Sequence, residues 1–489
     1  MSDELERLAS SCILPGFEGP VVPDWVRRRL SEGLGGVVLY AWNVESPEQL
    51  RALTEDLRSE RDDLVIAIDE EGGDVTRLEA TTGSSYPGNG ALGVVDDAEL
   101  TERVGTSLGA ELASVGINLD FAPVADVNTN ALNPVIGIRS FGADAELVAR
   151  HVDAFVRGLQ RAGVAACAKH FPGHGDTSVD SHLALPVVES IEDVALEPFR
   201  AAISAGVQSI MTAHIVVRAL GDAPATMSTE ILHDLLRDQL GFRGLVVTDA
   251  LEMNAVSASV GVEEGAVGAI AAGADALCLG HDLFDESVLG VRDALVTAVR
   301  QGRLTEERLV EATERVGAVT AWALEQRPSA QVDREAGRNA ARRALRVEGE
   351  ARLERPSLVV ELEPETGMAA GRLSQQPGEW FQAVVPDASL VRFDGTSVDL
   401  DVPLDGRQLV IIARDAHRHA WERDTIAELT SRARDAIVIE IGAPHWRPPA
   451  AATYVATQGA ARVNLESAAE ALYSGPRRGV EQSGSSPGS

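Results

Sequence analysis

Short apolar runs alternate with longer segments of helical character over roughly the first 280 residues of the chain. Each run is five or six residues long and holds few polar positions, which is typical of a parallel strand buried on both faces. The segments between the runs space their apolar residues as amphipathic helices do. The eight predicted strands are Ser11–Pro15, Gly36–Ala41, Leu64–Ile68, Ile117–Ala122, Val164–Ala168, Ser209–Ala213, Gly244–Thr248 and Ala274–Leu279. The clearest predicted helices are Ala98–Ser114, Glu146–Ala162, Ser190–Ala205 and Glu263–Ala272.

Eight strand-and-helix units favour a closed (β/α)₈ barrel over an open, doubly wound sheet. The open sheet of dinucleotide-binding proteins carries a Gly-x-Gly-x-x-Gly turn between strand and helix, and none of the predicted strands leads directly into one. We therefore expect an α/β protein whose first domain, residues 1–326, is a TIM-type barrel.

The pattern of apolar and polar residues changes after residue 326. A polar stretch that contains Pro328 leads into a predicted connecting helix, and together they form a linker over residues 327–345. A second alternation predicts a smaller α/β sandwich domain over residues 346–474, with a parallel or mixed sheet. Its predicted strands are Ser357–Glu361, Phe381–Val385, Gln408–Arg414 and Ala436–Gly442. Residues 475–489 are rich in Gly, Ser and Pro, which predicts a disordered tail.

Charge and cysteine content exclude several classes of function. The chain has 43 basic and 75 acidic residues, a net charge of −32, which disfavours binding to nucleic acids and to anionic membranes. It has neither an apolar run of about 20 residues nor a basic, apolar leader, so we predict no membrane association and a cytoplasmic location. Cys12, Cys167 and Cys278 are scattered through apolar stretches, which predicts buried thiols rather than disulfides or a thiolate metal site.

Polar side chains gather just after the predicted strands, at the end where barrel enzymes carry their active sites. A purely structural barrel would show such residues at either end, so the bias favours an enzyme over a binding scaffold. The residues in these positions are Asp69, Glu70, Glu71, Asp126, Lys169, His170, His214, Asp249, His281 and Asp282.

Lys169 is the only lysine in the chain, and all 42 other basic residues are arginine. A lone lysine indicates a position where a compact ammonium fits and a planar guanidinium does not. Chance survival is the alternative explanation.

The segment Lys169–His182 reads KHFPGHGDTSVDSH and is the richest in candidate chemistry. Its proline and glycines disfavour helix and strand alike, so we predict a loop. Its histidines and aspartates suit a divalent metal, with His214 or His281 supplying further ligands. Alternatively, Asp180 orients His182 in an acid/base dyad. We favour the dyad, because a glycine-rich loop is a poor metal cage.

Asp249 ends the predicted strand Gly244–Thr248 and is followed by apolar residues, which would hold its carboxylate rigidly in the barrel mouth. The residue could act as a nucleophile, a general base or a metal ligand. Capping of the following helix explains the position about as well.

Four segments together resemble the motifs of bacterial β-N-acetylglucosaminidases of glycoside hydrolase family 3. Lys169–His182 resembles the family's signature loop, and Asp69–Arg77 is similar to its D-Q-E-G-G-R-V-x-R motif. Asn133–Gly142 and Val247–Leu251 complete the match in the family's order. The resemblance covers the whole barrel and implies a barrel followed by an α/β sandwich.

The resemblance also implies a role for each matching residue. Asp249 corresponds to the catalytic nucleophile, His182 to the general acid/base and Asp180 to its partner. The residues implied to bind the sugar's hydroxyls and N-acetyl group are Asp69, Arg77, Arg139, Lys169 and His170. Two positions depart from the pattern: Glu70 replaces a glutamine and Asp74 replaces an arginine, so we expect extra negative charge near the mouth.

The implied activity is that of a retaining exo-β-N-acetylglucosaminidase, which needs neither a metal nor another cofactor. Its expected partners are small β-linked GlcNAc glycosides, such as cell-wall turnover fragments. A phosphorylase that uses inorganic phosphate at the same site is the nearest alternative. Less favoured are a β-glucosidase, a metallohydrolase built on the His/Asp loop and a sugar-binding barrel without catalysis.

Overall fold

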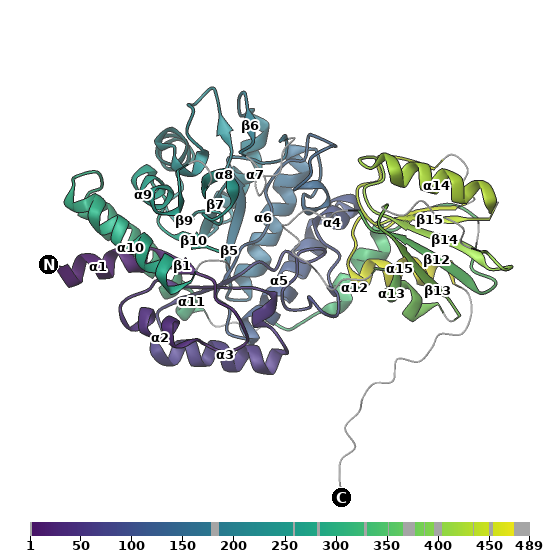
Figure 1. Ribbon diagram of the computed structural model, residues 1–489, viewed down its shortest axis with the longest axis horizontal. Coiled ribbons are helices and arrows are strands. Elements are labelled where there is room, and N and C mark those ends of the chain that lie inside the picture. Colours follow the sequence, from purple (N-terminus) through teal and green to yellow (C-terminus); the bar gives the residue numbers. More distant parts are fainter. Residues whose placement is uncertain are drawn as a thin grey trace, which may run out of the picture.

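The computed structural model describes residues 2–177, 185–257, 260–280, 284–326, 330–350, 352–364, 377–385, 387–395, 403–433, 435–448 and 453–473. Two lobes are visible in it: a larger one formed by the first two thirds of the chain and a smaller one formed by the last third (Figure 1). The predicted tail, residues 475–489, lies outside the described residues.

The larger lobe is a parallel β-barrel surrounded by helices. Six strands form one sheet in the order β2-β3-β4-β5-β7-β9, and β1 pairs in parallel with β10. A parallel bridge between Val247 and Ala276 joins β9 to the start of β10. The barrel strands are β1 (Ile13–Pro15), β2 (Gly36–Leu39), β3 (Val65–Ile68), β4 (Leu119–Asp120), β5 (Ala165–Phe171), β7 (Ser209–Thr212), β9 (Leu245–Val247) and β10 (Leu277–Leu279). Each lies within or overlaps a predicted strand, and the predicted fold class is confirmed.

The ring of strands closes where β2 approaches β1. The N–H of Gly35 donates a hydrogen bond to the Ser10 carbonyl at 3.2 Å. A Cβ atom on Gly35 would lie 2.1 Å from the carbonyl oxygen of Ser11. Only glycine therefore allows this approach.

Four of the helices around the barrel start at a side chain that caps their first turn. Ser46, Asp97, Asp144 and Thr305 each accept a hydrogen bond from a backbone N–H in the first turn of the helix that follows. The α-helices of this lobe are α1 (Ser2–Ser11), α2 (Asp24–Ser31), α3 (Pro47–Glu60), α4 (Asn89–Val95), α5 (Ala98–Ser114), α6 (Ala145–Arg161), α7 (Asp193–Ser204), α8 (Asn254–Ser257), α9 (Val262–Ala272), α10 (Asp285–Arg300) and α11 (Glu306–Glu325). The remaining elements are η1 (Ala41–Asn43), η2 (Gly137–Arg139), η3 (Ala225–Met227), η4 (Glu230–Gln239), β6 (Val187–Val188) and β8 (Val216–Val217).

The two ends of the barrel differ in chemistry. Before β10, the buried Asp275 carboxylate accepts hydrogen bonds from Arg237, Arg308 and Arg315 at 2.6, 2.5 and 2.8 Å. This cluster lies at the amino-terminal end of the strands, where barrels carry stabilising rather than catalytic groups. The candidate catalytic residues lie at the other end.

The smaller lobe is a three-layer α/β/α sandwich. Its sheet runs β11-β16-β15-β14-β12-β13, and only β11 pairs antiparallel. Helices α13 and α15 pack on one face and α14 on the other (Figure 1). The strands are β11 (Arg346–Gly349), β12 (Ser357–Leu362), β13 (Ser389–Phe393), β14 (Gln408–Ala413), β15 (Ile437–Glu440) and β16 (Thr453–Ala456). The helices are α12 (Arg334–Ala344), α13 (Pro377–Val384), α14 (Ala420–Arg432) and α15 (Arg462–Leu472).

One predicted strand of this lobe is wrong. Phe381–Val385 overlaps the end of α13, and the neighbouring strand is β13. Gly378, Phe381 and Val385 are buried at spacings of three and four residues, which places them on one face of a helix. Pro377 also suits the first turn of a helix. The two valines at positions 384 and 385 made the run look like a strand.

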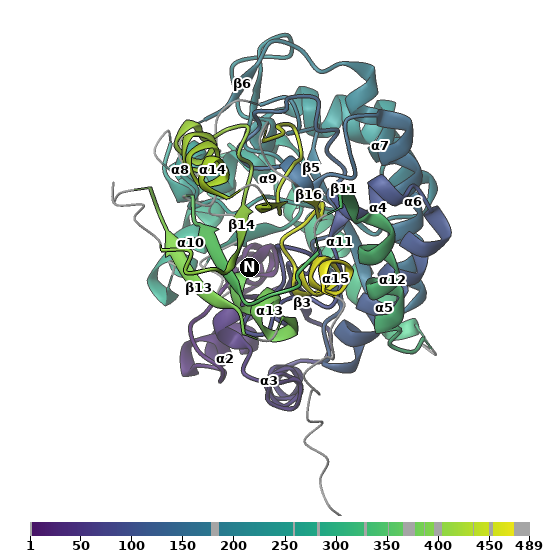
Figure 2. The same ribbon diagram turned by 90° about the vertical axis from the view of Figure 1, so that its right-hand side faces the viewer.

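The second lobe contacts the loops that follow β3 and β4. His417 donates a hydrogen bond from Nε2 to the Ala131 carbonyl at 2.8 Å, and Arg462 donates to Ser85 Oγ at 2.8 Å. Figure 2, viewed from the side of the second lobe, shows that lobe in front of the barrel and the barrel helices around it. The second lobe therefore lies against the end of the barrel that carries the candidate site.

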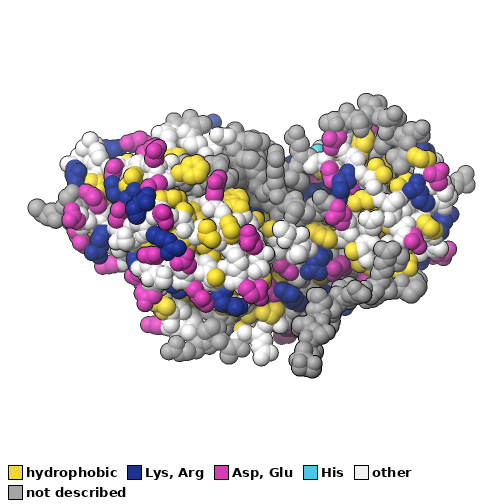
Figure 3. All heavy atoms as spheres, turned by 60° about the horizontal axis from the view of Figure 1, so that its bottom comes forward, with side chains coloured by type: hydrophobic (Ala, Val, Ile, Leu, Met, Phe, Trp, Pro, Cys, Tyr) yellow, Lys and Arg dark blue, Asp and Glu magenta, His cyan; other side chains and the backbone are white. Residues whose placement is uncertain are grey.

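Acidic and basic side chains are interspersed over the face shown in Figure 3, without a continuous basic stripe on that face. Among the residues that the structure describes, no helix combines the length and the apolar character needed to span a membrane.

Candidate active site

Lys169 and His170 lie at the end of β5 rather than in a loop. The strand extends to Phe171, with an irregularity in its pairing with β7 between Ala168 and Phe171. The Lys169 carbonyl accepts from the Ala125 N–H at 2.5 Å, so its backbone remains paired. The prediction of a loop is therefore wrong for residues 169–171, because pairing with neighbouring segments extends the strand up to Pro172.

The Lys169 ammonium binds two carboxylates from the loop after β3. Its Nζ lies 2.6 Å from Asp69 Oδ1 and 2.7 Å from Glu71 Oε1. The Lys169 and Glu71 side chains are each 2% exposed, whereas that of Asp69 is 20% exposed. Asp69 is thus the member of this trio that is open to the barrel mouth.

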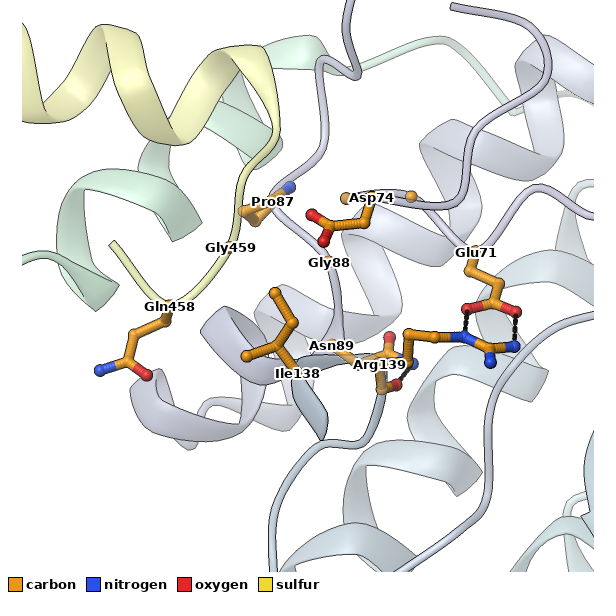
Figure 4. A pocket seen from close by; sticks show the side chains of 11 residues that line it. Glu71, Asp74, Pro87, Gly88, Asn89, Ile138, Arg139, Gln458 and Gly459 are labelled. Carbon is orange, nitrogen blue, oxygen red and sulfur yellow. Dashed lines mark hydrogen bonds and ion pairs between the residues drawn. The ribbon is translucent and has the colours of Figure 1, made fainter. Parts of the chain in front are cut away.

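Arg139 completes the charge cluster. Its Nε and Nη2 donate to the two oxygens of Glu71 at 3.0 and 2.7 Å, in the parallel geometry that favours arginine–carboxylate pairs. Figure 4 shows the two groups facing each other. Arg77 Nη2 lies 3.8 Å from Asp69 Oδ2. The structure therefore brings Asp69, Arg77, Arg139 and Lys169 together.

Mutual neutralisation keeps this cluster ionised despite its burial. Burial acts to lower the pKa of Lys169, but the Asp69 and Glu71 carboxylates outweigh it and raise that pKa above its ordinary value. Burial acts to raise the pKa of Glu71, but Arg139 and Lys169 outweigh it and hold that pKa below its ordinary range. The cluster offers an ionised carboxylate and cations, which suit sugar hydroxyl and amide groups.

His170 is oriented by Asp126, which follows β4. His170 Nδ1 lies 2.7 Å from Asp126 Oδ2, and the His174 N–H donates to Asp126 Oδ1 at 2.6 Å. Burial acts to raise the pKa of Asp126, but His170 outweighs it and the pKa is lowered. Burial lowers the pKa of His174 to about 4, so its ring is neutral at neutral pH.

Asp249 begins the turn after β9. Its Oδ1 accepts a hydrogen bond from the Ala250 N–H at 2.8 Å, and the Ala250 carbonyl accepts from His214 Nε2 at 3.0 Å. His214 Nδ1 lies 2.7 Å from Thr226 Oγ1. Both ring nitrogens of His214 therefore contact protein groups, which does not fit the predicted alternative that His214 is a metal ligand.

Four candidates, Asp282 among them, lie outside the described residues. Asp180 and His182 fall in the segment 178–184, and His281 falls in the segment 281–283. The dyad therefore remains a prediction.

Glu70 and Asp74, the two residues that depart from the family pattern, add less negative charge near the barrel mouth than the sequence suggests. Glu70 is buried, and its Oε2 accepts from the N–H groups of Arg77 and Leu78 at 2.7 and 2.9 Å. Asp74 is also buried; it pairs with Arg414 of the second lobe and accepts from the Ala460 N–H at 3.0 Å. The expectation of extra negative charge near the mouth is therefore corrected for Asp74, which Arg414 neutralises.

A cleft next to the charge cluster lies between the lobes (Figure 4). The barrel contributes the Glu71–Asp74 segment and Arg139 to its lining, and the second lobe contributes Gln458 and Gly459. Gln458 has a φ of +60°, which is uncommon for a residue other than glycine.

Sequence reasoning assigned no role to two residues of the site. Glu71 joins Lys169 to Arg139, and Asp126 orients His170. Both residues directly follow predicted strands, and this position is the signal in the sequence that could have indicated a role in the site. Their partners are distant in sequence, so the pairing itself had no local signature.

Comparisons with known proteins agree with the geometry. A family model described as Glycosyl hydrolase family 3 N terminal domain matches residues 24–319. Beta-hexosaminidase A of Pseudoalteromonas piscicida is 36% identical over 317 residues, which are 58% of this chain and 52% of that protein. The chain thus spans about half the length of that relative. A Beta-hexosaminidase of Neisseria gonorrhoeae is 36% identical over 292 residues, 55% of this chain and 80% of that protein.

A solved structure matches nearly the whole chain. It is a glycoside hydrolase family 3 beta-N-acetylglucosaminidase from Paenibacillus sp. str. FPU-7, which is 33% identical and superposes with a TM-score of 0.86 over 96% of both chains. Together with the family model, which covers more than half of the sequence, this match confirms the predicted family. The chain belongs to glycosyl hydrolase family 3.

Proposed function

We propose that the protein is a retaining exo-β-N-acetylglucosaminidase that releases GlcNAc from small β-linked glycosides through a covalent glycosyl-enzyme intermediate. The observation that carries the proposal is the cluster of Asp69, Glu71, Lys169 and Arg139, which lies at the same end of the barrel as Asp249. The names of the relatives and of the Paenibacillus structure support the N-acetylated sugar.

Asp249 is the proposed nucleophile. Its carboxylate attacks the anomeric carbon while the leaving-group oxygen takes a proton, and water then displaces the carboxylate from the same face that the leaving group occupied. Two displacements restore the original configuration. The hydrogen bond from Ala250, whose carbonyl is held by His214, supports a fixed orientation for the attacking carboxylate.

The proposed acid/base is His182, oriented by Asp180. An imidazole near its ordinary pKa can protonate the departing oxygen and later deprotonate water. The assignment rests on the match of both residues to the family's signature loop. An uncharged base does not repel an anionic acceptor, which is why phosphorolysis stays an alternative.

Sugar binding is assigned to Asp69, Arg77, Arg139, Lys169 and His170. Asp69 accepts hydrogen bonds from hydroxyl groups, and the cations donate to hydroxyl and carbonyl oxygens. We infer cell-wall turnover fragments as the natural substrates and the cytoplasm as the location. Cys12, Cys167 and Cys278 are all free and buried, which suits a reducing compartment.

The experiment compares p-nitrophenyl β-GlcNAc with p-nitrophenyl β-glucoside, each with and without phosphate and with and without EDTA. We expect GlcNAc release with retained configuration, indifferent to phosphate and EDTA. Stimulation by phosphate with a sugar-1-phosphate product would establish the phosphorylase. Preference for the glucoside would indicate a β-glucosidase, and loss of activity in EDTA would indicate a metallohydrolase. Each of these results would contradict the proposal.

The nucleophile is tested in the same assay. Asp249→Ala should lower kcat by at least about 10³-fold, because the covalent route is lost. A fluorinated GlcNAc analogue with a good leaving group should label Asp249 in the wild type, as measured by peptide mass spectrometry. An active alanine variant, or a label on another carboxylate, would refute the assignment.

A further inference from the structure

Trp42 is a large aromatic side chain that is partly exposed to solvent. It lies in η1, the short turn directly after β2, and is 40% exposed. Among the large, exposed apolar side chains of the described residues it is the one tryptophan.

The surroundings of Trp42 hold its ring in one orientation. Its Nε1–H donates to the Phe17 carbonyl at 2.9 Å, and its ring stacks on Tyr40 with centroids 4.7 Å apart and planes 18° apart. Asn43 holds the same turn in place, because its Nδ2 donates hydrogen bonds to the Phe17 and Gly19 carbonyls at 2.9 and 2.7 Å. Because the ring is already fixed, it loses little conformational freedom when it binds a flat partner.

Tyr40 connects this ring to the candidate site. In the pairing of β2 with β3, Leu39 lies opposite Ile68, so Tyr40 and Asp69 are the next positions along the two strands. Tyr40 packs on the apolar layer inside the barrel, and a Cβ on Gly16 would lie 2.8 Å from its ring. Trp42 therefore stacks on a residue at the barrel mouth beside Asp69.

We propose that Trp42 is a stacking platform for the sugar unit on the leaving-group side of the cleaved bond. The inference rests on the proposed function, in which Asp69 binds the GlcNAc unit that is released. A pyranose ring presents C–H groups on one face, and that face suits a fixed indole ring that stacks on Tyr40, beside Asp69. Aromatic side chains with a few polar groups are the usual lining of such sites.

The test compares leaving groups that do and do not contain a ring. In Trp42→Ala, kcat/KM for the β-1,4-linked GlcNAc disaccharide should fall about tenfold, the size of one aromatic contact. For 2,2,2-trifluoroethyl β-GlcNAc, which has nothing to stack, it should stay within about twofold of wild type. Trp42→Phe should keep most of the activity on the disaccharide.

Controls separate stacking from damage to the fold. Val310→Ala removes an exposed apolar side chain on the outer helix α11 and should leave both substrates unaffected. Equal losses on both substrates, or no loss on the disaccharide, would overturn the platform. A loss on p-nitrophenyl β-GlcNAc alone would overturn the assignment to a sugar. If the wild type cleaved none of these compounds, the proposed function itself would fail.

Discussion

At the scale of single residues, Lys169 illustrates why an arginine-rich chain keeps one lysine. Its ammonium lies 2.6 Å from Asp69 and 2.7 Å from Glu71, with the side chain 2% exposed. A planar guanidinium is larger and would have to displace one of these carboxylates or Arg139, which already binds Glu71. The position therefore needs a compact cation.

We predict that Lys169→Arg lowers kcat/KM for p-nitrophenyl β-GlcNAc by about 100-fold or more, because Asp69 is displaced. Lys169→Met should also lower the Tm, because it leaves the buried Glu71 and the partly exposed Asp69 without their shared cation. Steady-state kinetics and thermal unfolding check both outcomes.

Arg303→Lys is the matched control for this pair of variants. Arg303 pairs with Glu264 on the surface, with side chains 44% and 55% exposed. The exchange should change neither activity nor Tm. Wild-type activity in Lys169→Arg would show that the site tolerates a guanidinium.

At the scale of elements, the loop after β3 is held from inside by Glu70. Burial, which is the largest influence, raises the pKa of Glu70 from 4.5 to about 7, although the N–H groups of Leu78 and Arg77 oppose the shift. In the unfolded chain the carboxyl ionises near its ordinary pKa. Ionisation of Glu70 in the folded protein is therefore costly, and the free energy of unfolding falls as the pH rises from about 4.5 to 7.

We predict that Glu70→Gln raises the free energy of unfolding at pH 8, by up to on the order of 3 kcal/mol, because glutamine cannot ionise. Its amide oxygen can still accept the two N–H groups. The difference between variant and wild type should vanish near pH 4, where both side chains are neutral. Denaturant unfolding at several pH values measures it.

The control for Glu70→Gln is Glu428→Gln on the exposed face of α14, which should have little effect at either pH. A gain in stability that is the same at pH 4 and pH 8 would contradict the role assigned to ionisation.

At the scale of the whole molecule, the second lobe holds the loop after β3 in place. Arg414 pairs with Asp74, and the Ala460 N–H donates to the same carboxylate at 3.0 Å. Asp74 lies three residues after Glu71, which binds Lys169 and Arg139. The second lobe is thereby connected to the charge cluster without supplying a residue to it.

We predict that Arg414→Ala raises KM for GlcNAc substrates about tenfold and changes kcat little, because the loop loosens while Asp249 stays in place. Asp74→Asn should have a similar effect, and the double variant should be no worse than either single variant. Steady-state kinetics on all three variants check the coupling.

The control is Arg343→Ala, which breaks the partly exposed pair between α12 and Asp97 at 2.6 Å and leaves the loop after β3 untouched. Its KM should equal that of the wild type. Additive effects of Arg414→Ala and Asp74→Asn would show that the two residues act independently.

The strands and helices of the barrel could be predicted because their signal is local. Alternation of apolar runs with helical spacing located all eight barrel strands, and predicted Ala98–Ser114 coincides with α5. The errors arose where local signals conflict. Phe381–Val385 is apolar enough for a strand but has helical spacing, and residues 169–171 continue β5 just before a proline and a glycine.

The sequence by itself determined the fold class, the end of the barrel at which the candidate residues lie and the residues available there, because periodicity and strand ends are properties of neighbouring positions. Only the tertiary structure decided the partners. Lys169 meets Asp69 across 100 residues and Arg414 meets Asp74 across 340. Such pairs follow from which strands and lobes pack together. Packing is driven by the burial of apolar surface, so the sequence around a charged residue does not show which partner it will meet.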